Sequence, residues 1–261
     1  MRLRSCLGLA TAAVCLLCGP VPASALQINN SLAHFATGGG WKTTWFVYNS
    51  GTVSGSAQFN FYGNDGHPIV IPLTNSLSQT ILTPASSFST GLVPPSGLVA
   101  IESQANTPSD TQGWSQLVTQ NPFMIAFSTF HYQPTVGTAQ QGVVTSESRN
   151  GLSYVVPYSD SKTAFTAIAM ANITAAPVTV NVTFHDVQSG NQFGAGTLNL
   201  PAMGHLAFVL AKDSFPIAAG TTGTVEFTTG TPGQLTVLGL IFDATSFAFF
   251  SIPPIVKLPP S

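Results

Sequence analysis

The chain has 261 residues, a net charge of −2 at pH 7 and only 6% charged residues, against about a quarter in a typical soluble domain. It has no basic stripe that could neutralise phosphates, so nucleic acid is not an expected partner. All three cysteines (Cys6, Cys15 and Cys18) precede Pro20, so the rest of the chain can form neither a disulfide nor a thiolate metal site.

Residues 1–25 have the pattern of a cleaved signal peptide. Two arginines precede an apolar stretch over 7–17, prolines break it, and Ala23-Ser24-Ala25 offers small residues at the cleavage positions. The apolar stretch is too short to span a bilayer, so we expect no membrane span. A lipoprotein anchor at Cys18 is disfavoured, because Leu17 stands where a small residue is needed. We therefore expect a secreted protein, either extracellular or in the periplasm or cell envelope.

Residues 34–51, HFATGGGWKTTWFVYNSG, lead into the first clear strand. The three glycines are followed by an alternating run rather than by a helix, which favours a turn over a phosphate-binding loop. Beyond them, short runs of β-branched and aromatic residues alternate with Gly, Pro, Asn and Ser clusters, which is typical of an all-β fold. Examples of the predicted strands are residues 43–48, 56–62, 69–73, 123–132, 177–185, 223–228, 235–243 and 246–252.

The two halves of the chain resemble each other. Residues 45–66 align with 168–190 at a nearly constant offset, which brings Asn49 onto Asn172. Each asparagine precedes a small-residue turn, and we expect it to end a strand by bonding its own chain. Further matches place 82–87 on 199–204, 98–103 on 222–228 and 124–130 on 236–242.

The repeat predicts two tandem Ig-like antiparallel β-sandwich domains after the signal peptide, since about 100 residues is a usual sandwich size. The expected boundaries are 1–25 for the signal peptide, 26–143 for the first sandwich, 144–153 for a linker, 154–252 for the second sandwich and 253–261 for a proline-rich tail.

The segments GGGWKTT, FNFYGNDGHP, LTPASS, VAIES and IAFSTF, followed by the degenerate second copy, resemble a group of uncharacterised exported β-sandwich proteins of soil bacteria such as acidobacteria. The resemblance covers nearly all of the chain after the signal peptide. It implies a fold and an extracellular setting, and it brings no catalytic or binding residue.

Motifs for catalysis are missing from the sequence. It contains no G-x-S-x-G nucleophile turn, and no two of its five histidines have the spacing of a metal-binding pair. His131 and His185 are expected on strand surfaces. We therefore predict a non-enzymatic protein without cofactor or metal, with calcium binding by a loop aspartate left open.

Aromatic residues are the best candidates for ligand contact. Trp41, Trp114 and Tyr62 are predicted to be able to stack on sugar rings, while Trp45 is expected in the core. The polar segment 106–121 is interpreted as a loop insertion absent from the second copy, and as a variable contact site. Arg149 is expected to fix the angle between the domains through a carboxylate such as that of Glu147.

The leading functional hypothesis is a structural, adhesive or protein-interaction role outside the cytoplasm, with envelope or extracellular proteins as partners. The first alternative is a carbohydrate-binding module that holds polysaccharide. The second is a periplasmic assembly chaperone, which is disfavoured because such chaperones are usually basic and this chain is acidic.

Overall fold

The computed structural model describes residues 28–105, 110–133, 140–147, 151–246 and 248–259. The predicted signal peptide and Arg149 lie outside these ranges. The described chain is nearly all antiparallel β-structure, which confirms the predicted all-β class. Its two helical turns are short (η1, Leu210–Ser214; η2, Pro216–Ala218), and no described helix could cross a membrane.

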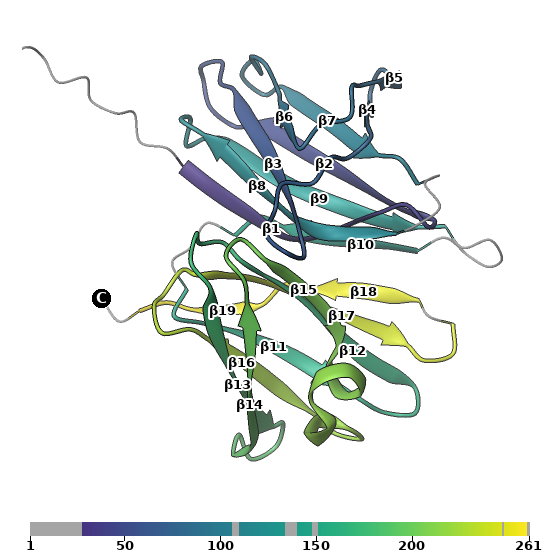
Figure 1. The fold of residues 1–261 in the computed structure, drawn as a ribbon, viewed down its shortest axis with the longest axis vertical. Coiled ribbons are helices and arrows are strands. Elements are labelled where there is room, and N and C mark those ends of the chain that lie inside the picture. The colour runs from purple at the N-terminus through teal and green to yellow at the C-terminus, as the bar shows by residue number, and fades with distance from the viewer. Residues whose placement is uncertain (1–27, 106–109, 134–139, 148–150, 247, 260–261) are drawn as a thin grey trace, which may run out of the picture.

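The N-terminal half, residues 28–147, forms two sheets that face each other (Figure 1). We call the larger one the six-stranded sheet. The smaller sheet has the order β1 (Ile28–Thr37), β8 (Thr111–Thr119), β3 (Ala57–Gly63), β6 (Ser87–Ser89). The six-stranded sheet has the order β10 (Gln140–Thr145), β9 (Met124–Tyr132), β2 (Trp41–Asn49), β7 (Leu98–Ser103), β4 (Leu73–Asn75), β5 (Thr80–Ile81).

The C-terminal half, residues 151–259, forms two further sheets below the first pair in Figure 1. The sheet that faces the N-terminal half is called the junction sheet. It has the order β15 (His205–Val209), β12 (Ala164–Asn172), β17 (Leu235–Asp243), β18 (Phe249–Ile252). The outer sheet has the order β14 (Gln192–Leu200), β13 (Val178–Asp186), β16 (Thr222–Thr228), β11 (Ser153–Ser159), β19 (Ile255–Lys257).

Two predicted boundaries differ from the strand bounds. Strand β10 extends to Thr145, beyond the end expected for the first unit at 143. The predicted tail is not separate from the sheets, because Ile255–Lys257 pairs with Ser153–Val155 of β11. The prolines at 253 and 254 end β18 and let the chain cross to the other sheet, where strand pairing resumes.

The strand order repeats between the halves. Strand β2 lies between β7 and β9, and β12 lies between β15 and β17. Strand β7 therefore corresponds to β15, and β8 corresponds to β16. The predicted match of 98–103 with 222–228 is wrong, because short apolar runs alone do not show to which sheet a strand belongs. The match of 82–87 with 199–204 is wrong too: the backbone N–H groups of Asn49 and Asn172 donate to the carbonyls of Gly97 and Gly204, so 94–97 corresponds to 201–204.

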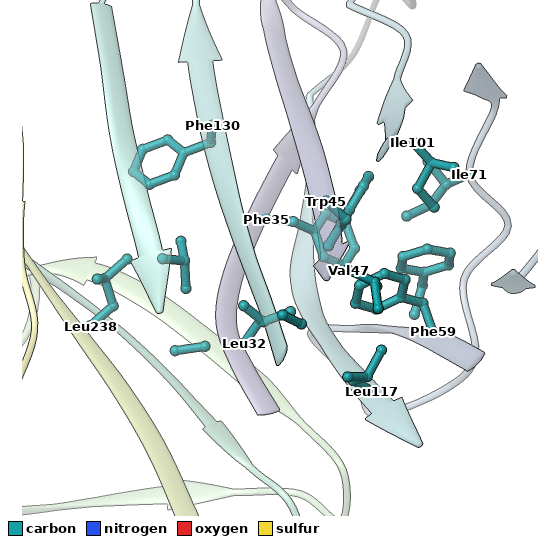
Figure 2. Close-up of a cluster of buried hydrophobic side chains, with 14 of the residues drawn as sticks. Leu32, Phe35, Trp45, Val47, Phe59, Ile71, Ile101, Leu117, Phe130 and Leu238 are labelled. Atoms are coloured by element: carbon teal, nitrogen blue, oxygen red, sulfur yellow. The ribbon is translucent and has the colours of Figure 1, made fainter. Parts of the chain in front are cut away.

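Each half has its own core, built from the inward side chains of its two sheets. The first core surrounds Trp45, with Phe35, Phe59 and Val47 beside it (Figure 2). The indole N–H of Trp45 donates to the Ser115 hydroxyl at 3.0 Å, so the polar atom of this buried ring has a partner. The second core contains Tyr154, Tyr158, Phe184 and Phe227 among its largest residues.

The glycines at 38–40 form a turn between β1 and β2. Their φ angles are 78°, 59° and 92°, which side chains rarely adopt. The backbone groups of Gly38 and Trp41 exchange two hydrogen bonds of 2.9 Å. The turn interpretation of this stretch is therefore confirmed.

Asn49 and Asn172 perform the same task in the two halves. The amide of Asn49 donates to the carbonyls of Val53 and Val93, at 2.8 and 2.9 Å. The amide of Asn172 donates to those of Ala176 and Pro201, at 2.7 and 2.8 Å. Each buried side chain thus ties a turn to the end of its strand, as predicted.

Candidate functional site

The six-stranded sheet turns one face away from its core, and that face is largely apolar. Tyr48 on β2 is paired with Leu98 on β7 and with Ile125 on β9. One row further along, the rings of Phe46 and Phe127 stack 4.7 Å apart. Together with a neighbouring side chain on β10 these residues form what we call the apolar face: Phe46, Tyr48, Leu98, Ile125, Phe127 and Val143.

The apolar face is open to solvent. Ile125 is 50% exposed, Leu98 and Val143 are 44% exposed, and Tyr48 and Phe127 are 37% exposed. Single exposed apolar residues are common, whereas contiguous apolar patches are less common on soluble monomers. None of its six residues is charged. The nearest ion pair on this side of the sheet joins Lys42 to Glu102 at 3.1 Å, so its two charges compensate each other.

The junction sheet carries the equivalent face, and there it is covered. Ala171 pairs with His205 and Thr236, as Tyr48 pairs with Leu98 and Ile125. Ala169 and Leu238 occupy the positions of Phe46 and Phe127. Ala169, Leu238 and Leu240 are buried in the same cluster as the core of the N-terminal half, and Figure 2 shows Leu238 on its border, opposite Phe130.

A buried histidine pair joins the two halves. His34 on β1 and His205 on β15 lie with Nδ1 and Nε2 3.2 Å apart. The other nitrogen of His205, Nδ1, is 2.7 Å from the side-chain oxygen of Asn64. This network is satisfied when both rings are neutral: His205 donates to Asn64, and His34 donates to His205.

Burial lowers the pKa of both imidazoles, because the charged form would lose its water. The pKa of His34 falls from 6.5 to about 4, through burial alone. The pKa of His205 is lowered well below its usual value, first by burial and then by repulsion from His34. Both rings are therefore neutral at physiological pH.

Further contacts fix the halves around the histidine pair. The indole N–H of Trp114 donates to the Met203 carbonyl at 2.7 Å. Gly66 has a φ of 81°, and a Cβ there would lie 1.9 Å from the Ala202 carbonyl oxygen, so only glycine fits. A cavity of about 220 Å³ remains beside the pair, with Trp41, Phe130 and Phe242 among its walls and Asp213 at its lining.

The three aromatic residues predicted to contact a ligand do not form one site. Trp114 is fully buried in β8, so the expectation that it is exposed is wrong. Tyr62 is half-buried and stacks on Trp114, 4.9 Å away. Trp41 is half-buried at the junction and stacks on Tyr132, 4.6 Å away. The ring of Trp114 is not available for a sugar.

The prediction of a polar loop at 106–121 is wrong for the described residues of this segment. Residues 106–109 are outside the described residues, but 111–119 form β8, in the middle of a sheet. The polar residues of this segment suggested an exposed loop, but Ser115 and Thr119 are buried. Their hydroxyl groups have partners there: Ser115 accepts from Trp45, and Thr119 donates to the Ser56 carbonyl.

Glu147, predicted as an interdomain residue, lies beside the N-terminal half. Its backbone exchanges two hydrogen bonds with Ser31 of β1, at 2.7 and 2.9 Å. Its predicted partner, Arg149, is outside the described residues, so the proposed pair stays a prediction. The contacts between the halves include the group of His34, His205 and Asn64, which the sequence analysis did not single out. His34 stands inside the apolar run LAHFA, a pattern typical of a strand buried on both faces.

The clearest cluster of ionisable groups lies on the outer sheet and is an ordinary ion pair. Glu226 accepts from Lys257 at 2.7 Å and from the Ser153 hydroxyl at 2.5 Å. Burial acts to raise the pKa of Glu226, but these two donors outweigh it, so the pKa is lowered overall. No group of three or more metal-ligating side chains comes together among the described residues.

Comparison with known proteins adds no assignment. No protein-family model matches the chain, and no curated protein matches it either.

Proposed function

We propose that this is an exported, non-enzymatic protein of two tandem Ig-like β-sandwich domains, made with a cleaved signal peptide, and that it has a structural or adhesive role outside the cytoplasm. In this proposal it contacts other proteins through the apolar face. The observation that carries the proposal is that face: six uncharged apolar residues on paired strands, five of them at least 37% exposed.

The sparse charge of the chain supports this role. Only sixteen of its residues are Lys, Arg, Asp or Glu. A surface with few charges offers little repulsion to a neighbouring chain, and net charge near zero favours association. The resemblance to exported β-sandwich proteins and the pattern of residues 1–25 support a location outside the cytoplasm.

A polysaccharide-binding role through Trp41, Trp114 and Tyr62 has less support. Trp114 is buried, and the rings of Trp41 and Tyr62 each have one face against another aromatic ring. A polysaccharide pull-down with Trp41→Ala tests whether Trp41 still contributes to sugar binding. Unchanged retention on the polysaccharide excludes this role. The assembly-chaperone alternative rests on size and domain number alone.

Photo-crosslinking tests the proposed function. A photoreactive phenylalanine analogue at Phe127 reports on the apolar face, and the same analogue at Val187, which is 62% exposed on a turn of the C-terminal half, is the matched control. We expect position 127 to crosslink to protein, either another copy or a different exported chain, and position 187 not to. Equal labelling at both positions, or no protein product at 127, contradicts the proposal.

A further inference from the structure

The N-terminal half sits on the junction sheet with one particular side, next to β1 and β10. Phe130 stacks on Phe249 of β18, with ring centres 5.3 Å apart and planes 4° apart. Gly142, the partner of Phe130 on β10, has no room for a side chain, because a Cβ would lie 2.6 Å from the Phe130 ring and 2.9 Å from the Phe249 ring. His34 adds the contact with His205. We call His34, Phe130 and Gly142 the seated side.

The C-terminal half has the equivalent side. Phe130 is aligned with Thr43, and Ile241 with Thr166, at the same places on β2 and β12, so Ile241 occupies the position of Phe130. Phe250 pairs with Ile241 and therefore occupies the position of Gly142.

The β1 position has its counterpart too. Phe35 pairs with Gly113, and Tyr158 pairs with Gly223. A Cβ at Gly113 would lie 2.0 Å from the Tyr62 carbonyl oxygen of β3, and a Cβ at Gly223 would lie 2.1 Å from the His185 carbonyl oxygen of β13. This shared close approach supports the equivalence of the two glycines. Strand β1 has a bulge between Leu32 and Phe35, so Ala33 and His34 together stand where β11 has the single residue Pro157, one residue before Tyr158. We call Pro157, Ile241 and Phe250 the distal side.

The distal side is uncovered. Phe250 is 58% exposed, Pro157 is exposed and Ile241 is half-buried. Each chain thus has one covered pair of surfaces, the seated side on the junction sheet. Among the described residues, the equivalent pair, the distal side and the apolar face, is mostly exposed, with the backbone N–H of Val143 donating to the Ser251 hydroxyl at 3.1 Å.

We propose that copies of this chain associate head to tail, with the distal side of one copy on the apolar face of the next. This inference rests on the proposed function, because it names the partner of the same face. The contact joins two different surfaces, so it does not close after two copies and can extend into a chain of molecules.

The chemistry of the two free surfaces fits this contact. Neither contains a charged residue, so no buried charge would be left unpaired when they meet. Phe46 and Tyr48 are larger than Ala169 and Ala171, which they replace, so the intermolecular contact would be spaced more widely than the one within the chain.

Two variants that each lose one surface test the inference. The face variant is Ile125→Lys with Leu98→Lys, and the side variant is Phe250→Lys; all three positions are at least 44% exposed, so the fold should tolerate them. Val187→Lys is the control. Sedimentation velocity of the purified full chain measures association as concentration rises.

We expect the wild type and Val187→Lys to form a series of species larger than a dimer. Each surface variant alone should remain monomeric, with a dissociation constant raised at least about tenfold. Mixed together, the face variant and the side variant should form a dimer that stops growing, because one intact face meets one intact side.

The other outcomes overturn the inference. A wild-type dimer that does not grow, or variants whose mixture stays monomeric, excludes head-to-tail contact. A wild type that is monomeric at all concentrations excludes self-association, while a crosslink from position 127 to a different protein would leave the proposed function standing. Circular dichroism of each variant shows whether it is folded, and the photo-crosslink at position 127, mapped to the strands of the second copy, tests the same contact without any charge substitution.

Discussion

The outer faces of the six-stranded sheet and the junction sheet have the same strands in the same pairing register, and yet one is open and the other is covered. The difference is visible along β2 and β12. In β2 buried and less buried residues alternate from Thr43 onward, whereas the last five residues of β12, from Ile168 to Asn172, are all buried. A strand that is buried on both faces needs small or apolar residues at every position, and the run Ala169-Met170-Ala171 supplies them.

The two halves of the repeat have the same positions in the fold but different surroundings. At equivalent places the open face has Phe46, Tyr48 and Leu98, and the covered face has Ala169, Ala171 and His205. The alanines let the N-terminal half approach closely. The larger residues of the open face are mostly exposed in the part of the chain that the structure describes, and the proposed partner would cover them.

The largest expected effect contrasts Leu238 with its equivalent, Phe127. Leu238 is 3% exposed at the junction, so Leu238→Ala leaves a cavity and should lower the free energy of unfolding by about 2 to 5 kcal/mol. Phe127→Ala removes an exposed ring that stacks on Phe46, and should lower it by only about 1 kcal/mol. Urea denaturation of the two purified variants, followed by fluorescence, gives both values.

Equal losses in the two variants would show that the faces do not differ in burial as the structure has them. Val53→Ala, at a position 64% exposed in a turn, is the reference for a surface change and should alter the free energy of unfolding by less than about 0.5 kcal/mol.

Sequence patterns predicted the strands of β2, β3, β9, β13 and β17 well, because alternation over seven to nine residues is a strong signal. They failed at β8. Trp114 and Ser115 are buried next to each other, and the serine is there to accept from Trp45, which lies in another sheet. A hydrogen bond between residues 70 positions apart leaves no local pattern in the sequence.

The candidate site was predicted less well than the fold. The residues of the apolar face follow normal strand alternation, so the sequence shows that they share a face but not whether another element covers it. The histidine pair depends on how the two halves pack together. His34 and His205 are 171 positions apart, and the sequence around one histidine does not indicate contact with the other.

Acid should weaken the covered face specifically. The pKa of His34 is about 4 in the folded chain against 6.5 when unfolded, so the unfolded chain binds more protons between these values. Stability is therefore fully present above about pH 6.5 and falls as the pH drops toward 4, by up to about 1.4 kcal/mol per pH unit for this group. Urea midpoints measured from pH 7.5 to pH 4 follow this loss.

His34→Asn provides the comparison, since its amide can still donate to His205 and does not titrate. We expect a shallower fall in this variant, with the part from His205 remaining. Val53→Ala changes an exposed turn residue that does not titrate and should keep the wild-type slope. Identical slopes in all three proteins would assign the acid effect to other groups, such as Asp65, Asp186 and Asp243, whose pKa values are lowered by hydrogen bonds to nearby residues.

The smallest expected difference is between Asn49→Ala and Asn172→Ala. Each removes a buried amide that donates to two turn carbonyls, so each should lower the free energy of unfolding by about 1 to 3 kcal/mol, and the two losses should agree closely. Urea denaturation measures both, and Asn191→Ala, in an exposed turn, is the control.

Agreement between the two asparagine variants would mean that the strand-end device acts the same way whether its sheet is open or covered. A much larger loss for Asn172→Ala would instead couple its turn to the junction, because Pro201, one of its two acceptors, begins the segment that presents Met203 to Trp114 and His205 to His34. In that case the packing of the covered face depends on the turn that Asn172 holds. The two asparagines would then be equivalent in geometry but not in their contribution to the free energy of unfolding.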